Sequence, residues 1–310
     1  MYLVKIQSPE DVKKLDVEQL KVLAGEMRQA LIQKLSVHGG HVGPNLGMVE
    51  ATIAMHYVFD SPKDKMVFDV SHQSYCHKML TGRADAFLDE AKYDDVSGYS
   101  EPSESAHDFF CIGHTSTSVS LACGLAKARD LADENYNVIA VIGDGSLSGG
   151  EALEGLDFAK ELNGNLIVVV NDNEMSIAEN HGGLYENLKL LRDTKGQAEC
   201  NIFKAMGLNY VFVEDGNDLT QLIDAFKRVK DSKAPVAVHI HTLKGKGYTL
   251  AEENKESWHW HMPFDIETGK TKGNYDGGED YGTLTADYLL QKMKEDASVV
   301  AITSATPTVF

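Results

Sequence analysis

The sequence has few cysteines, no long apolar run and no excess of positive charge, and each shortage excludes a class of protein. Its four cysteines (Cys76, Cys111, Cys123 and Cys200) lie far apart without a CxxC pair, so we expect reduced thiols rather than disulfides or zinc. Nowhere do about 18 apolar residues follow one another, and the amino-terminal segment lacks the basic and apolar parts of a secretory signal. We therefore expect a cytoplasmic protein that does not enter a membrane.

Acidic residues outnumber basic ones by 47 to 29, which gives a formal net charge of -18. Nucleic acids and anionic membranes select basic surfaces, so we expect neither as a partner. An anionic substrate would need locally placed cations or a metal. With 310 residues, 43% of them hydrophobic, the chain can bury a core like an ordinary globular protein.

Helical and strand patterns alternate along the chain. Asp16 with Gln19 predicts the start of a helix that continues to about residue 37. The other predicted helices cover residues 48–58, 116–132, 148–164 and 219–229, and the predicted strands cover 65–70, 137–144, 165–172, 210–213 and 235–242. The stretch between residues 173 and 209 is read as irregular.

The strand patterns are near-continuous runs of valine and isoleucine, each followed by a helix, which indicates a parallel sheet covered on both faces. We predict a doubly wound α/β domain over residues 1–270 and a linker over 271–282, which is rich in Gly, Lys and Asp. Residues 283–310 begin another helix and strand. A single helix and strand cannot bury a core, so we expect the start of a second α/β domain, incomplete at Phe310.

Two strand patterns end in polar residues, at "GDG" around Asp144 and at "NDN" ending in Asn173. Ligands of α/β sheets bind beyond the carboxyl ends of the strands. A tight turn with Asp144 as a helix cap is the simplest interpretation of "GDG" alone. A dinucleotide site is the next alternative, but a carboxylate repels a pyrophosphate unless a cation lies between them.

Magnesium would resolve that conflict, since it takes oxygen ligands and shares them with phosphates. Asp144 and Asn173 would supply two of these oxygens. Gly145 would let the backbone approach a phosphate closely, and the amides after Ser146 would help to hold it.

At this spacing, "GDG" followed by "NDN" resembles the diphosphate and magnesium motif of thiamine diphosphate enzymes. The resemblance implies thiamine diphosphate and Mg²⁺ as cofactors and a transketolase-like diphosphate domain. It assigns the metal to Asp144, Asn173 and the main-chain carbonyl of Met175.

Further segments resemble, in the same order, the 1-deoxy-D-xylulose-5-phosphate synthase family within the transketolase branch. They include "HVGPNLGMVEATIAMHYVFD", "FDVSHQSYCHKMLTGR", "IGHTSTSVSLACGLA", "NDNEMSIAEN" and "KGKGY". Transketolase has a proline-leucine pair where this chain has His114 and Thr115, which favours the synthase family. The resemblance implies a homodimer that condenses pyruvate with glyceraldehyde 3-phosphate, with loss of carbon dioxide.

Such a reaction moves protons at two oxygens, and histidine suits this near neutral pH. Any single one of the 12 histidines is more often a surface or core residue. His41 and His72 lie inside matching motifs, so we predict that they transfer protons or orient substrate, with His72 also near the cofactor. His259 matches the family's late active-site histidine, with His261 as the alternative.

The resemblance also assigns cofactor contacts to the loop of Gly113, His114 and Thr115, to Gly145, Ser146 and Asn173, and to Tyr248. Lys244 and Lys246 are plausible cations near phosphate, and a solvated loop is the alternative.

The chain departs from the family where "SGYSEPSESAHD" carries Ser100, Glu101 and Pro102 in place of a Pro-Lys-Arg tripeptide. Two positive charges become one negative charge, which disfavours a phosphorylated substrate at this loop. A transketolase-like reaction with another ketose or aldehyde pair is therefore the alternative, and a non-catalytic cofactor-binding paralogue is a third hypothesis. The family's activating glutamate comes from the second domain, so we expect residues 1–310 alone to bind cofactor without turnover.

Overall fold

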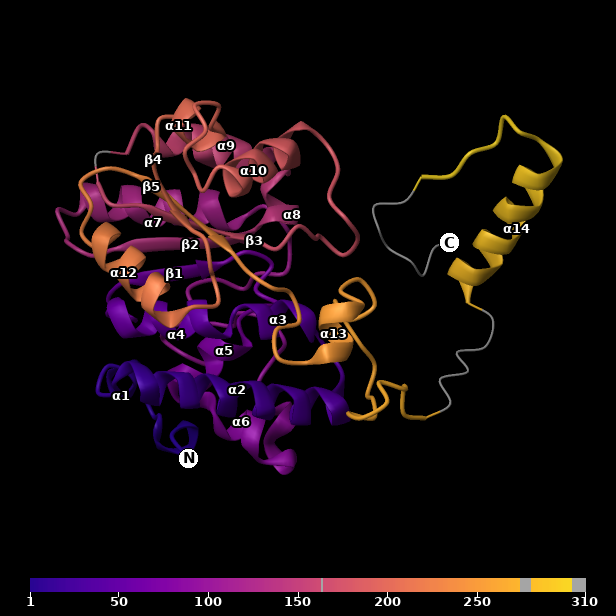
Figure 1. Cartoon of the computed structure of the whole chain (residues 1–310), viewed down its shortest axis with the longest axis horizontal. Coiled ribbons are helices and arrows are strands. Elements are labelled where there is room, and N and C mark those ends of the chain that lie inside the picture. The colour runs from indigo at the N-terminus through magenta and orange to yellow at the C-terminus, as the bar shows by residue number, and fades with distance from the viewer. Residues whose placement is uncertain (163, 274–279, 303–310) are drawn as a thin grey trace. The chain divides into compact units, whose positions relative to one another are not determined.

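A parallel sheet is the centre of the computed structural model, which describes residues 1–162, 164–273 and 280–302 (Figure 1). The strands found there are β1 (Lys65–Phe68), β2 (Val138–Gly143), β3 (Ile167–Asp172), β4 (Asn209–Val213) and β5 (Val236–His241). Their order across the sheet is β1-β2-β3-β5-β4, and every neighbouring pair is parallel. The predicted α/β fold with a parallel sheet is confirmed.

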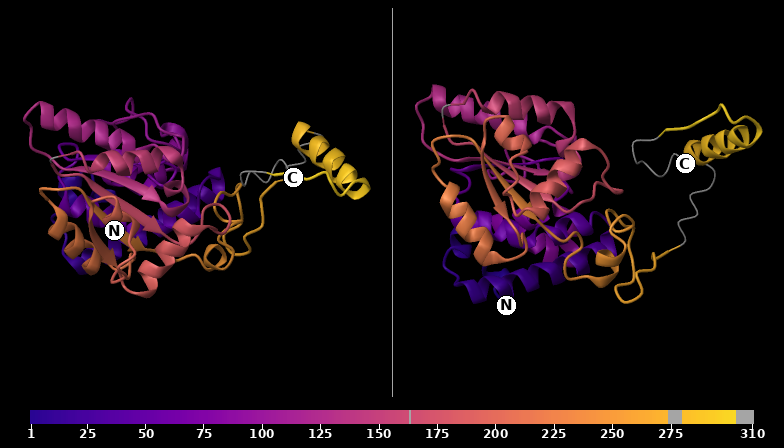
Figure 2. Two further views of the ribbon diagram at one scale, coloured as in Figure 1. Left: turned by 90° about the horizontal axis from the view of Figure 1, so that it is seen from above. Right: turned by 45° about the horizontal axis from the view of Figure 1, so that its top comes forward.

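Helices cover both faces of this sheet, as two further views make clear (Figure 2). Successive strand residues point to opposite faces: Ile139 and Val141 of β2 belong to one buried cluster, and Ala140 and Ile142 belong to the other. The first layer contains α2 (Val17–His38), α4 (Val49–Val58) and α12 (Leu219–Val229), and the second contains α7 (Ser118–Leu131), α9 (Gly150–Ala159) and α10 (Gly183–Asp193).

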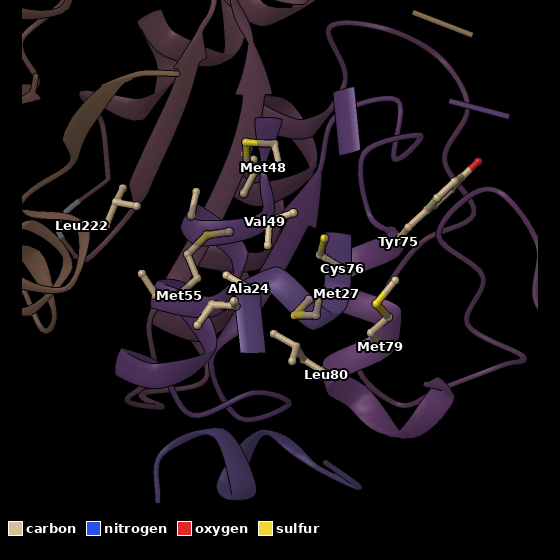
Figure 3. Close-up of a cluster of buried hydrophobic side chains, with 14 of the residues drawn as sticks. Ala24, Met27, Met48, Val49, Met55, Tyr75, Cys76, Met79, Leu80 and Leu222 are labelled. Carbon is tan, nitrogen blue, oxygen red and sulfur yellow. The ribbon is translucent and has the colours of Figure 1, made fainter. Parts of the chain in front are cut away.

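The core of the first layer is rich in methionine, whose flexible side chain fills irregular space (Figure 3). Met27, Met55 and Met79 are fully buried in it. Tyr75, at the start of α5 (Tyr75–Lys78), belongs to the same cluster, and its hydroxyl group points away from the methionines. Packing in the core therefore fixes the Tyr75 ring, and its hydroxyl group lies at the border of the core.

The predicted start of the long helix α2 is confirmed. The Asp16 carboxylate accepts the backbone N–H of Gln19 at 2.9 Å, and the Gln19 side chain accepts the backbone N–H of Asp16 at 3.0 Å. This reciprocal arrangement satisfies two amides that a helix otherwise leaves without partners.

The prediction of irregular structure for residues 173–209 is wrong, because α10 and the short α11 (Ile202–Ala205) lie there. Leu188 and Leu191 of α10 are fully buried. Gly182, which precedes this helix with a positive φ of 119°, and Gly183, its first residue, obscure its start because adjacent glycines are typical of loops. The spacing of the leucines was the signal that would have revealed it.

Short elements connect the longer ones. They are η1 (Leu3–Lys5), α1 (Pro9–Val12), α3 (Gly43–Gly47), η2 (Met79–Arg83), α6 (Asp85–Leu88), η3 (Glu90–Asp95), α8 (Asp144–Leu147) and α13 (Thr249–Glu253).

The chain divides into two units, Met1–Thr271 and Lys272–Phe310. The second unit contains the predicted helix as α14 (Tyr281–Glu295), whereas residues 296–302 form no strand. The rest of the predicted strand (303–310) and part of the predicted linker (274–279) lie outside the described residues.

Within the described ranges, no helix is both long and apolar enough to cross a membrane. All four cysteines are free, and Cys76 and Cys123 are buried.

Candidate active site

The two polar strand ends meet in space. β2 ends at Gly143 and pairs in register with Asn171 of β3, so Asp144 and Asn173 follow neighbouring strands at the same edge of the sheet. One Asp144 oxygen accepts the backbone N–H of Asn173 at 3.2 Å, and the other accepts the N–H of Gly145 at 2.8 Å. The structure thus brings together two of the residues that the sequence assigned to one metal.

The donor set at this point suits a hard cation. Asn173 is buried, and its side-chain oxygen has no hydrogen-bond partner among the described residues. Burial, followed by the negative charge of Asp172, raises the pKa of Asp144 well above its ordinary value. A cation would supply the missing partner and the missing countercharge. In the described ranges, no group of three or more His, Cys, Asp or Glu residues could hold a metal. The predicted ligand set is of a different kind, because only one of its three ligands, the Asp144 carboxylate, belongs to these residue types.

Asp172, the middle residue of "NDN", holds the turn that carries Asn173. Its carboxylate accepts hydrogen bonds from Arg192, from His239 Nε2 at 2.8 Å and from the backbone N–H of Glu174 at 3.2 Å. Burial opposes its ionisation, but His239 and Arg192 outweigh this and hold its pKa at about 2. Sequence reasoning missed this residue because its partners lie far away in the chain.

Gly145 is required for close packing of α8 against the loop that follows Asn173. A Cβ atom on Gly145 would lie 2.4 Å from Ser176 Oγ and 3.0 Å from Ser176 Cα. A Cβ atom on Gly143 would meet nothing within 4 Å. The backbone between these two glycines therefore faces open space on one side and packed structure on the other, which suits the approach of a diphosphate.

The loop of Gly113, His114 and Thr115 is exposed and lies beside α8. Ser116, the next residue, donates a hydrogen bond from Oγ to the carbonyl of Ser146 at 2.7 Å. The buried Asp69 carboxylate, directly after β1, accepts the N–H groups of Ser116 at 2.8 Å and Ser118 at 2.9 Å. Asp69 is a second positioning residue that the sequence analysis did not assign.

His41, His72 and His259 form one group, here called the histidine cluster. Their ring centroids are 4.9 Å apart for His41 and His72, 5.3 Å for His72 and His259, and 5.9 Å for His41 and His259. Burial lowers the pKa of His41 to about 4, and burial with neighbouring positive charge lowers that of His259 to about 3 and that of His72 well below its ordinary value. All three are therefore neutral at pH 7.

Asn45 ties two of these loops together. Its amide nitrogen donates to the carbonyls of His41 at 2.9 Å and His72 at 2.8 Å, and its oxygen accepts the N–H of Tyr75 at 3.0 Å. The Tyr75 hydroxyl lies 3.5 Å from His41 Nδ1. Asn45 is fully buried, so these bonds fix the loops without competition from water.

His259 and His261 occupy different surroundings. The backbone of His261 pairs with that of Gly40 at 2.9 Å in both directions, and the Trp258 carbonyl accepts the N–H of Gly43 at 2.8 Å. The His261 ring stacks on Trp258 at 4.4 Å. Of the two alternatives, the structure brings His259 to the histidine cluster and His261 to an aromatic core.

Lys244 reaches this region from the "KGKGY" segment. It is 1% exposed, its amino group donates to the carbonyl of Ser176 at 2.6 Å, and burial lowers its pKa to about 8. Tyr248 instead packs its ring on Trp258 and donates its hydroxyl to the carbonyl of Ile266 at 2.8 Å. Lys246 is half-buried, and its carbonyl accepts a hydrogen bond from Arg28.

The loop with the changed tripeptide also borders the histidine cluster. The Tyr99 ring lies 6.1 Å from that of His41, and the N–H of Ser100 donates to Ser71 Oγ at 2.8 Å. Glu101 follows these two residues in the chain, and its carboxylate accepts the backbone N–H of Ser103 at 3.0 Å and the thiol of Cys111 at 3.5 Å.

Comparison with known proteins first defines the class of fold. The structure is similar to transketolases from Campylobacter jejuni, with a TM-score of 0.64 over 79% of this chain and 41% of that one, and from Leishmania mexicana, with 0.61 over 80% and 39%. Sequence identity is 20% in both cases, so the likeness establishes the transketolase-like fold.

Sequence comparison defines the family. The family model described as 1-deoxy-D-xylulose-5-phosphate synthase matches residues 3–200 and 189–242. Proteins of that name from Caldanaerobacter subterraneus and Listeria monocytogenes are each 42% identical over 98% of this chain. The chain belongs to the 1-deoxy-D-xylulose-5-phosphate synthase family, and the family resemblance predicted from the sequence is confirmed. The chain spans about half the length of these two relatives, 54% of the first and 51% of the second.

Proposed function

We propose that this chain carries the diphosphate-binding and metal-binding part of a 1-deoxy-D-xylulose-5-phosphate synthase. The reaction would condense pyruvate with glyceraldehyde 3-phosphate and release carbon dioxide, in a homodimeric cytoplasmic enzyme. One observation carries the proposal: in a member of this family, the Asp144 carboxylate accepts the backbone N–H of Asn173, whose buried side-chain oxygen has no hydrogen-bond partner among the described residues.

The proposed metal site consists of the Asp144 carboxylate, the Asn173 side-chain oxygen and the main-chain carbonyl of Met175, around Mg²⁺. Gly145, Ser146 and the exposed loop of residues 113–115 would hold the diphosphate. When bound, thiamine diphosphate would supply a carbanion at its thiazolium carbon. Tyr248 has a weaker case as a cofactor contact, because its hydroxyl already donates to Ile266.

The histidine cluster would move protons at the substrate oxygens. A neutral imidazole can accept a proton at one ring nitrogen, and Nδ1 of both His72 and His259 lacks a hydrogen-bond partner in the described structure. Their lowered pKa values keep them in the accepting form at pH 7. Lys244, which lies in the same region, would place a positive charge close to a carboxylate or phosphate of the substrate.

One observation favours a second candidate function. Glu101 lies in a loop whose neighbour Tyr99 borders His41, and its charge disfavours a phosphorylated acceptor there. A transketolase-like transfer from a ketose donor to an unphosphorylated aldehyde would avoid this repulsion.

The deciding experiment measures carbon dioxide release from pyruvate by the complete gene product with Mg²⁺ and thiamine diphosphate. Release that glyceraldehyde 3-phosphate stimulates would support the synthase reaction. No release despite tight cofactor binding would contradict it. Transfer from a ketose donor would then support the second candidate, and the absence of any turnover would support a non-catalytic paralogue.

A further inference from the structure

Residues 97–101 form a short segment at the border of the histidine cluster, here called the 97–101 segment. Its central side chain, Tyr99, is 40% exposed, and its ring lies edge-on to His41 with 6.1 Å between centroids. The N–H of Ser100 donates to Oγ of Ser71, the residue before His72. The segment therefore lies against two loops of the cluster and still presents an aromatic surface to solvent.

Two carboxylates hold the two ends of this segment. Glu104 accepts the backbone N–H of Ser97 at 2.6 Å, and Asp108 accepts the backbone N–H of Glu101 at 2.9 Å. Between these ends, Ser100 bonds to Ser71, and Tyr99 bonds to the Ser97 hydroxyl through its carbonyl at 2.7 Å and its N–H at 3.2 Å, within the segment itself. The path of the segment thus depends on where Glu104 and Asp108 lie.

Two cations, the half-buried Arg83 and the buried Lys78, fix both carboxylates. Arg83 donates two hydrogen bonds of 2.9 Å to the two oxygens of Asp108 and one of 3.1 Å to Glu104. Lys78, which is fully buried, pairs with the same oxygen of Glu104. A bidentate guanidinium contact of this kind sets orientation as well as distance.

Two histidines continue the network into the core. His77 Nε2 lies 3.1 Å from Asp108 and therefore carries a proton toward it, which leaves His77 Nδ1 to accept from His56 Nε2 at 2.9 Å. Both rings are buried, and burial lowers both pKa values, so this neutral arrangement holds at pH 7. A buried charged network contributes little net stability compared with apolar packing and serves better to fix one geometry.

We propose that Tyr99 is a substrate-contacting residue of the reaction site, and that Arg83, Glu104 and Asp108 are positioning residues that hold it beside His41. The kinetic part of this inference rests on the proposed function. The positional part stands on the hydrogen bonds alone.

Hydrogen exchange tests the positional part without any substrate. Asp108→Asn keeps the shape of the side chain but leaves a single acceptor oxygen and removes the charge, so the Glu101 amide and the Arg83 guanidinium are no longer both held as in the wild type. We expect amide exchange in residues 97–101 to become about tenfold faster or more. Glu104→Gln, at a less buried position, should act in the same way at Ser97.

Glu26→Gln is the matched control, because Glu26 accepts the backbone N–H groups of Tyr2 at 2.6 Å and Leu3 at 2.7 Å. It should accelerate exchange at the amino terminus and leave residues 97–101 unchanged. Unchanged exchange of residues 97–101 in both Asp108→Asn and Glu104→Gln would overturn the positioning role.

Steady-state kinetics of the complete gene product test the contact with substrate. Tyr99→Ala should raise KM for pyruvate or the aldehyde about fivefold or more, with unchanged affinity for Mg²⁺ and thiamine diphosphate, and Tyr99→Phe should restore most of the loss. Asp108→Asn should reproduce the change in KM, since it acts through Tyr99.

Phe158→Ala, on α9 in the other helical layer, removes a similarly exposed ring (45%) and should change nothing. Equal kinetics for Tyr99→Ala and Phe158→Ala would overturn the assignment of Tyr99. A wild-type protein that releases no carbon dioxide would instead contradict the proposed function, and the exchange data would still decide the positioning role.

Discussion

Replacing Asp144 by asparagine should stabilise the ligand-free protein and abolish its response to ligand. Asp144 is 2% exposed, and its pKa lies well above the ordinary 3.8 because of burial and the charge of Asp172. The folded state therefore binds a proton more readily than the unfolded state, so stability falls as the pH rises above 3.8. At pH 7 the ionised Asp144 carboxylate therefore destabilises the ligand-free fold.

Asparagine removes that cost but loses one of the two backbone hydrogen bonds, worth about 1 kcal/mol. We therefore expect the free energy of unfolding without ligand to rise at pH 7 in Asp144→Asn, and this gain to shrink as the pH falls toward 3.8. A ligand at 100 times its Kd stabilises the wild type by about 2.7 kcal/mol, which corresponds to roughly 5 to 10 °C in Tm. The variant should show no such rise, because a neutral amide is a poor replacement for the carboxylate ligand of Mg²⁺.

Differential scanning calorimetry with and without Mg²⁺ and thiamine diphosphate measures both effects. Asp64→Asn is the matched control: Asp64 is also 2% exposed and accepts the backbone N–H groups of Asp60 and Asn137, but it precedes β1 at the opposite edge of the sheet. This control should keep the ligand-induced rise. An equal rise in wild type and Asp144→Asn would refute the role of Asp144 as a metal ligand.

Three further predictions concern the same region. Gly145→Ala should lower the free energy of unfolding in urea by about 1 to 3 kcal/mol, because the new Cβ collides with Ser176. Gly143→Ala should leave this free energy almost unchanged and should weaken cofactor binding in a calorimetric titration. Asn45→Ala removes three buried hydrogen bonds and should cost about 2 to 4 kcal/mol in urea unfolding, and a loss below 0.5 kcal/mol would contradict its role in joining the loops. The histidine cluster stays neutral in the fold, so unfolded chains bind more protons between pH 6.5 and about 4, and stability should fall as the pH drops through this window. His41→Asn should flatten that slope in urea midpoints measured against pH, and an unchanged slope would mean that His41 titrates normally.

The fold could be predicted from the sequence because its strands are unusually apolar. Runs such as residues 138–142 and 166–170 are buried on both faces, so their composition alone identified strands of a covered parallel sheet. The long helix α2 was equally clear, since its cap residues Asp16 and Gln19 act on each other within four positions. Helix α10 was missed because the two glycines at its start resemble a loop, although four of its eleven residues are leucine.

For the candidate site, the sequence determined which residues end the strands. From these residues the family could be inferred, and Asp144 and Asn173 could be proposed as a metal-binding pair. The residues that hold this site in place could not be inferred, because the partners of Asp172 and Asn45 come from distant segments and leave no local sequence pattern. Only the tertiary structure decided that His259, and not His261, joins His41 and His72. The two histidines lie two positions apart, and their directions depend on the backbone pairing of residues 258–261 with residues 40–43, a contact between segments more than 200 positions apart in the chain.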